Sequence, residues 1–378
     1  MTAIENYGKL IKKIFGTDLA INNNKIAKNS VISALNHPTC FKLFKNNFKE
    51  RLFRLNKIYS HNLKYLNKIL VKVKEVADVN NWQGAFAELA AFDLFNQDFL
   101  SNKNYIQTPI KPDVNLDKSN TFALELGSSA NANLDGLVEE LSLYFDVKCF
   151  KDNFDEILNG IYKQVTKHFG RDDFNITAEY DLDISLNDLK TKRNPLLNEL
   201  KNAINPSYKT KLVNSKVLPH LTFRILWDTE IQTVERTYDP YKHAKNYHKM
   251  VFNYADKFVK DKPSLIVFVV FPWYNNVITN FSNNNTILYR ALSRRVFCQY
   301  RYKSIPFSSL YSKFSKSLTI FEVSNHLSGI VFLEDTTILS KEPHKTNVNS
   351  YVYLNPNAVN PLKKSSALDF IMGQYNSE

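Results

Sequence analysis

The sequence predicts an α/β fold, or α+β in its arrangement, with a mixed β-sheet flanked by helices. Along the chain, the periodicity of the apolar residues predicts helices first, then an antiparallel meander of strands and another helix. Buried strands separated by helices follow. Residues 264–271 (SLIVFVVF) are almost wholly apolar, which is typical of a strand covered on both faces. The chain is 44% hydrophobic with 27 Phe and 20 Tyr, enough to bury a large core.

The N-terminal part is predicted to be helical and basic. Between residues 39 and 77, apolar residues recur at steps of three and four, with Lys and Arg in the gaps. These helices could form a DNA-facing arm, a dimerisation element, or a plain packing layer with a solvated basic face. A further helix over residues 82–96 places Glu88 close to its apolar side, which is unusual for a carboxylate.

A three-strand meander is expected between residues 121 and 150. Its strands are 122–127, 134–140 and 141–150, and alternation on the third puts Asp146 and Lys148 on one face. The rest of the chain is expected to continue with a helix at 153–169, strands at 174–182, 217–227, 264–271, 328–334 and 350–354, and helices at 184–204, 237–260 and 285–301.

Charge is distributed as an acidic centre between two basic wings. The net charge is +11 over residues 1–75, −11 over 76–190 and +12 over 191–378. Basic surface attracts polyanions, whereas an acidic centre repels them unless a cation intervenes. The pattern favours a nucleic-acid groove with a metal-dependent centre, although a lysine-rich solubilising surface would give similar numbers.

Three residues of the meander carry the predicted chemistry. Asp135 begins one strand, and Asp146 and Lys148 follow on the next, so an antiparallel turn brings them together. Two adjacent carboxylates repel each other unless a cation bridges them, and carboxylate oxygens suit Mg²⁺. A lysine beside such a cation can orient or deprotonate water, or stabilise charge that builds on a phosphate. These are the parts needed to hydrolyse a phosphodiester.

Leu-Asp135-Gly followed by Asp146-Val-Lys148 resembles the signature of the PD-(D/E)XK nuclease superfamily, which has the restriction-endonuclease-like fold. The resemblance covers roughly residues 82–170 and implies that Asp135 and Asp146 bind metal and that Lys148 is the catalytic lysine. Gly84 and Glu88 match the GxxxE pattern that supplies a further metal ligand in many members. The helix after the lysine strand carries Gln164, where some subfamilies have a functional glutamine. Leu134 stands where proline is common in the family.

Structural readings of the same residues remain open at this point. Asp135 before Gly136 could be a turn residue. Lys148 could pair with Asp146 or Glu140 on an exposed face, and Glu88 could be a solvated helix residue. Glu125, on the first predicted strand, is a rival acid that ranks below Glu88.

Two later segments combine basic and aromatic residues and are expected to contact nucleic acid. Arg and Lys on a helix can bind phosphates, and Arg can also read guanine edges. The expected binding residues are Arg290, Arg294, Arg295, Arg301, Lys242, Lys245 and Lys249. The domain organisation follows as a basic helical region (1–78), a nuclease core (79–170 and 263–378) and an insertion that could carry target recognition (171–262).

The sequence as a whole predicts a Mg²⁺-dependent DNA endonuclease, with Mn²⁺ as a substitute metal, of the restriction (type II-like) or phage-defence kind. The alternatives are a non-catalytic DNA-binding protein on the same fold, and a nuclease directed at RNA or single strands. A homodimer is expected, because many enzymes of this family dimerise to cut both strands. No nucleotide cofactor is expected, because no Walker sequence is present. Without a signal peptide or membrane-length apolar run, we expect a cytoplasmic protein with no membrane partner.

Overall fold

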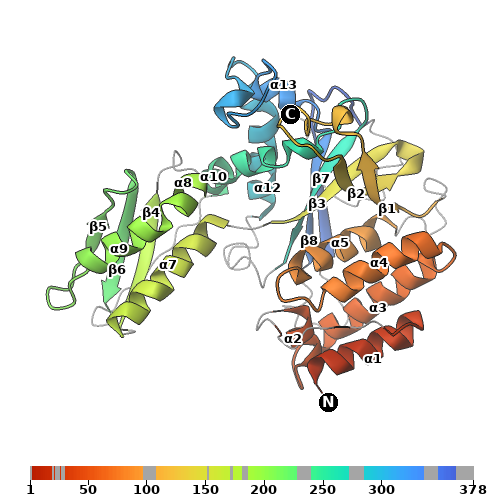
Figure 1. Cartoon of the computed structure of the whole chain (residues 1–378), viewed down its shortest axis with the longest axis horizontal. Helices are drawn as coiled ribbons and strands as arrows, with labels where there is room; N and C mark the ends of the chain where they lie inside the picture. The colour runs from red at the N-terminus through yellow and green to blue at the C-terminus, as the bar shows by residue number, and fades with distance from the viewer. Residues whose placement is uncertain are drawn as a thin grey trace. The chain divides into compact units, whose positions relative to one another are not determined.

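The structure is a computed structural model that describes residues 2–18, 21, 26, 30–96, 108–150, 153–170, 173–180, 186–227, 240–271, 285–335 and 348–362. It divides into two compact units, one formed by residues 1–150 and 240–378 and the other by residues 151–239. Each unit is described by itself. The predicted class is confirmed: helices flank a six-stranded mixed sheet (Figure 1).

The sheet of the first unit has the strand order β1-β2-β3-β7-β8-β9. The first three strands are antiparallel neighbours, β3, β7 and β8 run parallel, and β9 closes the sheet antiparallel to β8. The strands span Lys111–Leu116 (β1), Ala132–Val138 (β2), Leu143–Cys149 (β3), Ser264–Val270 (β7), Gly329–Asp335 (β8) and Val348–Leu354 (β9). Strand β7 is buried at every position, as its unbroken apolar run predicts, and β8 is also buried throughout.

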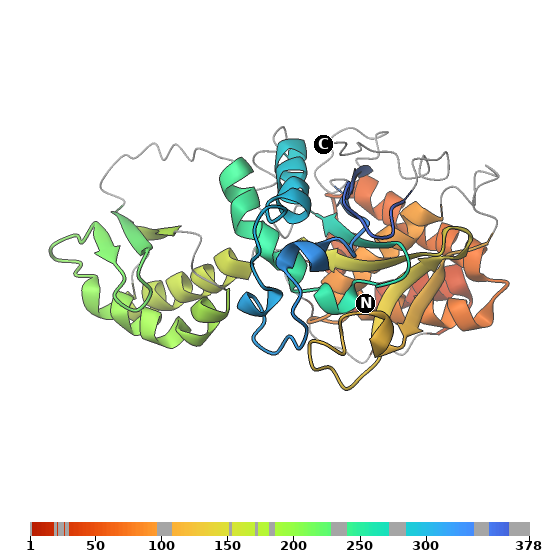
Figure 2. The ribbon, with the colours of Figure 1, turned by 90° about the horizontal axis from the view of Figure 1, so that it is seen from above.

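The N-terminal helices pack on one face of this sheet and belong to its core. Figure 2 shows them, coloured red to orange, gathered on one side of the strands. They share one hydrophobic cluster with Phe145, Val267 and Val331 of the central strands. Helix α5 is buried almost all round because it lies between this helical layer and the sheet. The helices are α1 (Ala3–Phe15), α2 (Val31–Asn36), α3 (Lys42–Tyr59), α4 (Leu63–Glu75) and α5 (Trp82–Phe95).

The opposite face of the sheet is lined with aromatic rings. Tyr289 of α12 (Asn285–Cys298) stacks on Phe332 of β8, with ring centres 4.1 Å apart. Tyr247 of α10 (Pro240–Phe252) meets Phe150 just after β3. Helices α10 and α12 pack on each other, and the short helix α13 (Ile320–Ser324) precedes β8. The residues of β3 that alternate away from α5 therefore face this second layer.

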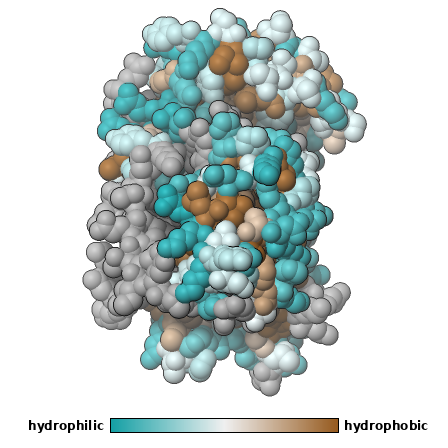
Figure 3. Space-filling view, turned by 90° about the vertical axis from the view of Figure 1, so that its left-hand side faces the viewer, coloured by the Kyte–Doolittle hydropathy of each residue, from teal (hydrophilic) through white to brown (hydrophobic). Residues whose placement is uncertain are grey.

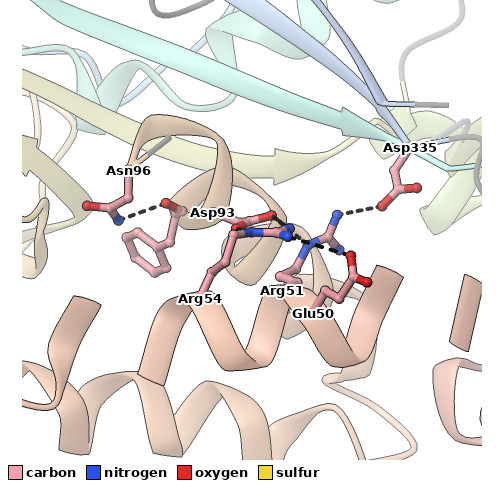
Figure 4. Close-up of polar contacts among 7 residues, drawn as sticks. Glu50, Arg51, Arg54, Asp93, Asn96 and Asp335 are labelled. Carbon is pink, nitrogen blue, oxygen red and sulfur yellow. Dashed lines mark hydrogen bonds and ion pairs between the residues drawn. The ribbon is translucent and has the colours of Figure 1, made fainter. Parts of the chain in front are cut away.

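A buried ionic network fixes α5 between α3 and the end of β8 (Figure 4). Arg54 donates two hydrogen bonds of 2.7 Å to the two oxygens of Asp93 on α5. Arg51 donates to Asp335 at 2.8 Å and lies 3.5 Å from Asp93. Because these charges are paired and hydrogen-bonded, they are tolerated inside the core.

The second unit has its own three-stranded sheet, in the order β4-β6-β5, and its own hydrophobic cluster. Its elements are α7 (Asn153–Phe169), β4 (Phe174–Tyr180), α8 (Leu186–Thr191), α9 (Arg193–Ala203), β5 (Leu212–Asn214) and β6 (Leu221–Trp227). This unit spans 151–239, so it begins and ends earlier than the expected insertion of 171–262. Helix α7 packs with α8, α9 and β4, and α10 belongs to the first unit.

One predicted strand is wrong. Residues 122–127 form turns, and the first strand of the antiparallel set is β1, at Lys111–Leu116. The burial of β1 alternates, but the strand contains Pro112, a residue that strands disfavour, and Asp113, whose φ of 48° lies in the left-handed region. The helix expected at 184–204 is two helices, α8 and α9, and the helix expected at 237–260 ends at Phe252.

In the described part of the chain, no helix combines the length and apolar character needed to cross a bilayer. On the face drawn in Figure 3, hydrophilic residues predominate among the coloured atoms and hydrophobic ones form small groups.

Candidate metal and catalytic site

Asp135, Asp146 and Lys148 come together where β2 and β3 lie side by side. The pairing of Gly136 with Phe145 puts Asp135 opposite Asp146 across the two strands. Lys148 Nζ lies 2.6 Å from Asp146 Oδ2 and 4.0 Å from Asp135 Oδ2. Gly136 is a strand residue and not part of a turn, and a Cβ there would lie 2.1 Å from the Phe145 ring. The turn reading of Asp135 is therefore wrong.

The side chain of Asp135 takes the place of a backbone acceptor. Its Oδ2 accepts a hydrogen bond of 2.6 Å from the amide of Val147 on β3. The β2–β3 pairing ends at Gly136 and Phe145, and Val147 is the next β3 donor that faces β2. The Asp135 carboxylate thus accepts a hydrogen bond from a backbone amide just beyond the point where the pairing of β2 and β3 ends. This contact fixes the carboxylate between the two strands.

Glu88 reaches the same place from α5. Its side chain is 13% exposed, and Lys72 of α4 binds it, with Nζ 3.0 Å from Oε1 and 2.9 Å from Oε2. A carboxylate so deeply placed is not the solvated helix residue of the alternative reading. The ion pair brings α4, a helix of the basic N-terminal region, into the site.

Asp113 of β1 is a site residue that the sequence reasoning missed. It lies between Pro112, which pairs with Gly136, and Val114, which pairs with Leu134, so it stands across from Asp135. Lys68 Nζ donates to the backbone oxygens of Pro112 and Asp113, at 2.8 and 2.6 Å, and stabilises this left-handed turn of the strand. The alternation of Ile110, Pro112 and Val114 was the available signal.

Glu88, Asp113 and Asp135 form a group of acids suited to a metal ion. Each offers a carboxylate oxygen, and these oxygens all lie within 4.8 Å of one another. Hard carboxylate oxygens from three elements fit a cation such as Mg²⁺. Asp146, predicted as a metal ligand, is outside this group of three and lies against Lys148.

The electrostatics of the cluster show an excess of negative charge. Burial, and then the charge of Asp135, raise the pKa of Glu88 to about 8. The same two causes raise the pKa of Asp146 to about 7. Burial alone would lower the pKa of Lys148, but Asp146 and Asp135 raise it overall, so its ammonium stays charged. A divalent cation would relieve the repulsion among these acids.

The segment after α10 forms the other wall around Lys148. The Lys148 ammonium lies 5.2 Å from the centre of the Tyr254 ring, a cation–π distance. The next residues form a short 3-10 helix, Ala255–Lys257, which packs on β2, and Lys257 donates to the backbone oxygen of Asn133. The positive charge of Lys257 is among the influences that lower the pKa of Asp146.

The predicted nucleic-acid-binding arginines lie on or just after α12. Arg290 and Arg294 are exposed, Arg295 is half-buried, and Arg301 lies over the Tyr302 ring. Helix α12 packs on β8 and β9, whereas the acids lie on α5, β1, β2 and β3. The structure therefore does not bring these arginines to the acidic cluster.

The remaining predicted residues are scattered. Lys245 is exposed on α10, and the side chains of Lys242 and Lys249 lie outside the described part of the structure. Gln164 is exposed on α7, in the second unit. The rival acid Glu125 is buried away from the cluster and binds Lys260 and Lys316 at 2.7 and 2.8 Å. Glu125 therefore has a structural role as the ion-pair partner of these two lysines.

Comparisons with known proteins found no relative. No protein-family model matches the chain, and neither the curated proteins nor the solved structures yield a match.

Proposed function

We propose that this protein is a Mg²⁺-dependent endonuclease of the PD-(D/E)XK kind, acting on DNA. The observation that carries the proposal is the position of Asp135. It stands between the Lys148–Asp146 pair of β3 and the carboxylates of Glu88 and Asp113. The order of these residues along the chain matches the family signature, and the mixed sheet between helices is compatible with the family's core.

In this mechanism Glu88, Asp113 and Asp135 would hold the metal. A bound Mg²⁺ supplies Lewis acidity toward the phosphate and lowers the pKa of a bound water. Lys148, kept protonated by Asp146 and Asp135, acts as a cation that orients the attacking water and stabilises charge on the phosphate. Asp146 holds that ammonium in place at 2.6 Å.

A restriction or phage-defence role and a homodimer follow from the family resemblance and from the need to cut two strands. The non-catalytic DNA-binding alternative has one supporting observation. Lys72 and Lys148 already lie against two of the acids, so those ion pairs give the cluster a structural purpose without any metal.

Plasmid cleavage in Mg²⁺ tests the proposal. The wild-type protein should convert supercoiled plasmid to nicked and linear forms, with no cleavage in EDTA. Asp146→Ala should reduce the rate by about a thousandfold or more, because Lys148, the cation that stabilises the transition state, loses the carboxylate that holds it. Cleavage that persists in Asp146→Ala, or is absent in the wild type, contradicts the enzymatic role. Parallel digests of single strands and RNA identify the substrate class.

A further inference from the structure

Three lysines recur every fourth residue on α4 and form a row along one side of the helix. They are Lys64, Lys68 and Lys72, and a rise of about 1.5 Å per residue separates neighbours by about 6 Å. The row ends at the acidic cluster, because Lys72 binds Glu88. Helix α4 packs on β1, the edge strand of the sheet.

Lys68 joins this row to β1 and to a fourth lysine. Its ammonium donates to the backbone oxygens of Pro112 and Asp113, one of the proposed metal ligands. Lys64 stands one turn before Lys68 on α4, and Lys111 directly precedes Pro112, whose backbone oxygen binds the Lys68 ammonium. Lys64 and Lys111 therefore lie beside Lys68.

Little negative charge compensates this concentration of lysines. Lys111 has a carboxylate of Glu139 at 3.7 Å, and both side chains are substantially exposed. Lys64 is exposed and has no ion pair with any part of the chain that the structure describes. Cations held together beside an acidic centre are arranged to receive a polyanion.

We propose that Lys64, Lys68 and Lys111 bind consecutive phosphates of a nucleic-acid backbone as it approaches the acidic cluster. Each nucleotide carries one negative charge, and lysines along the backbone bind it independently of sequence by releasing counterions. The inference rests on the proposed function, which supplies the reason for a nucleic acid at Asp113. It assigns the α4–β1 surface to substrate binding.

Binding of a fluorescein-labelled DNA duplex, measured by anisotropy with Ca²⁺ in place of Mg²⁺, tests this surface. The test variant is Lys64→Gln/Lys111→Gln, which spares the backbone contacts of Lys68. The matched control is Lys9→Gln/Lys13→Gln, which removes two exposed lysines one turn apart on α1. Melting temperatures should show that both variants fold.

The test variant should bind several-fold more weakly. Its plot of log affinity against log salt, between about 50 and 200 mM, should be less steep by about one unit for each lost phosphate contact. The control should keep the wild-type slope. An unchanged slope in the test variant, or an equal loss in the control, overturns the assignment.

Cleavage assays separate this inference from the proposed function. If the wild type never cleaves but the test variant loses affinity and slope, the nuclease proposal fails and the binding surface stands. If the wild type cleaves and the test variant binds and cleaves normally, the surface assignment fails alone. A wild type that binds neither duplex, single strand nor RNA overturns both.

Discussion

Helix α5 carries two buried carboxylates that have opposite surroundings. Asp93 meets two guanidinium groups, and Arg54 binds both of its oxygens at 2.7 Å (Figure 4). Glu88, one and a half turns earlier, lies with three other acids, Asp113, Asp135 and Asp146. Within the described residues, that second group has only the ammonium groups of Lys72 and Lys148 within ion-pair distance.

Charge balance, more than burial, therefore distinguishes a structural ion-pair network from a site that can bind a ligand. Arginine has a planar fork that satisfies both carboxylate oxygens, so the Asp93 network is closed. Lysine is a point charge, and two lysines leave four carboxylates with excess negative charge and open lone pairs.

The largest expected effect is loss of the closed network. Asp93→Ala leaves Arg54 without its bidentate partner and Arg51 with Asp335 alone, so the free energy of unfolding should fall by about 3 kcal/mol or more. Urea denaturation measures the change. Glu50→Ala, which removes an exposed partner 4.0 Å from Arg54, is the control and should cost under about 1 kcal/mol. A loss in Asp93→Ala no larger than in this control would contradict the contrast.

Lys72 should compete with a cation for Glu88. A metal that binds Glu88 must displace the Lys72 ammonium, so Lys72→Met should tighten Mn²⁺ binding by about tenfold, equivalent to about 1.4 kcal/mol. Isothermal titration calorimetry gives the affinity. Lys74→Met, an exposed lysine on the same helix, should leave it unchanged. Weaker binding in Lys72→Met would mean that this lysine supports the metal site.

Asp135→Asn should stabilise the metal-free protein. The charge of Asp135 raises the pKa of both Glu88 and Asp146, so removing it relieves repulsion in two places. The amide oxygen of asparagine can still accept from the Val147 amide. We expect a gain of about 1 kcal/mol by denaturation in EDTA, together with loss of cleavage. A loss of stability in Asp135→Asn would show that the negative charges of these acids are already balanced in the wild-type protein.

The last prediction is a pH dependence with a defined sign. Folding raises the pKa of Glu88 from 4.5 to about 8 and that of Asp146 from 3.8 to about 7. At pH values between the unfolded and the folded pKa of each acid, the folded protein binds more protons than the unfolded chain. The contribution of these two acids to stability therefore falls as pH rises toward 8.

A cation bound at Glu88 must displace the proton of that acid, so Mn²⁺ affinity should increase from pH 6 to pH 8. Thermal melts in EDTA and Mn²⁺ titrations across this range measure the two trends. Glu88→Gln should weaken the pH dependence of both the thermal stability and the Mn²⁺ affinity. A Mn²⁺ affinity that is independent of pH in the wild type would contradict the raised pKa values.

Much of the site was predictable because strand alternation and helical periodicity are local signals. They place Asp146 and Lys148 on one face and Glu88 near the buried side of α5, as the structure has them. Alternation was a signal for the strand that holds Asp113, but the places of Asp113 and Lys72 in the site were not predictable in this way. Their roles depend on pairing between β1 and β2 and on packing of α4 against α5, which join residues far apart in the chain.

Two features of the fold escaped sequence reasoning for physical reasons. Residues 122–127 alternate like a strand, but their backbone is held in turns that bury Phe122 and Glu125. Helix α7 has a clear apolar stripe, and periodicity cannot tell which sheet that stripe covers. Its partners are β4 and α9 of the second unit.

The most direct test of the central claim is calorimetric titration of the purified protein with Mn²⁺. We expect saturable binding by the wild type, and binding at least about tenfold weaker in Asp113→Asn, because one of three carboxylate ligands is lost. Asp117→Asn, which changes an exposed acid near the end of β1, should bind like the wild type. No binding by the wild type, or unchanged binding in Asp113→Asn, would contradict a metal site at these acids.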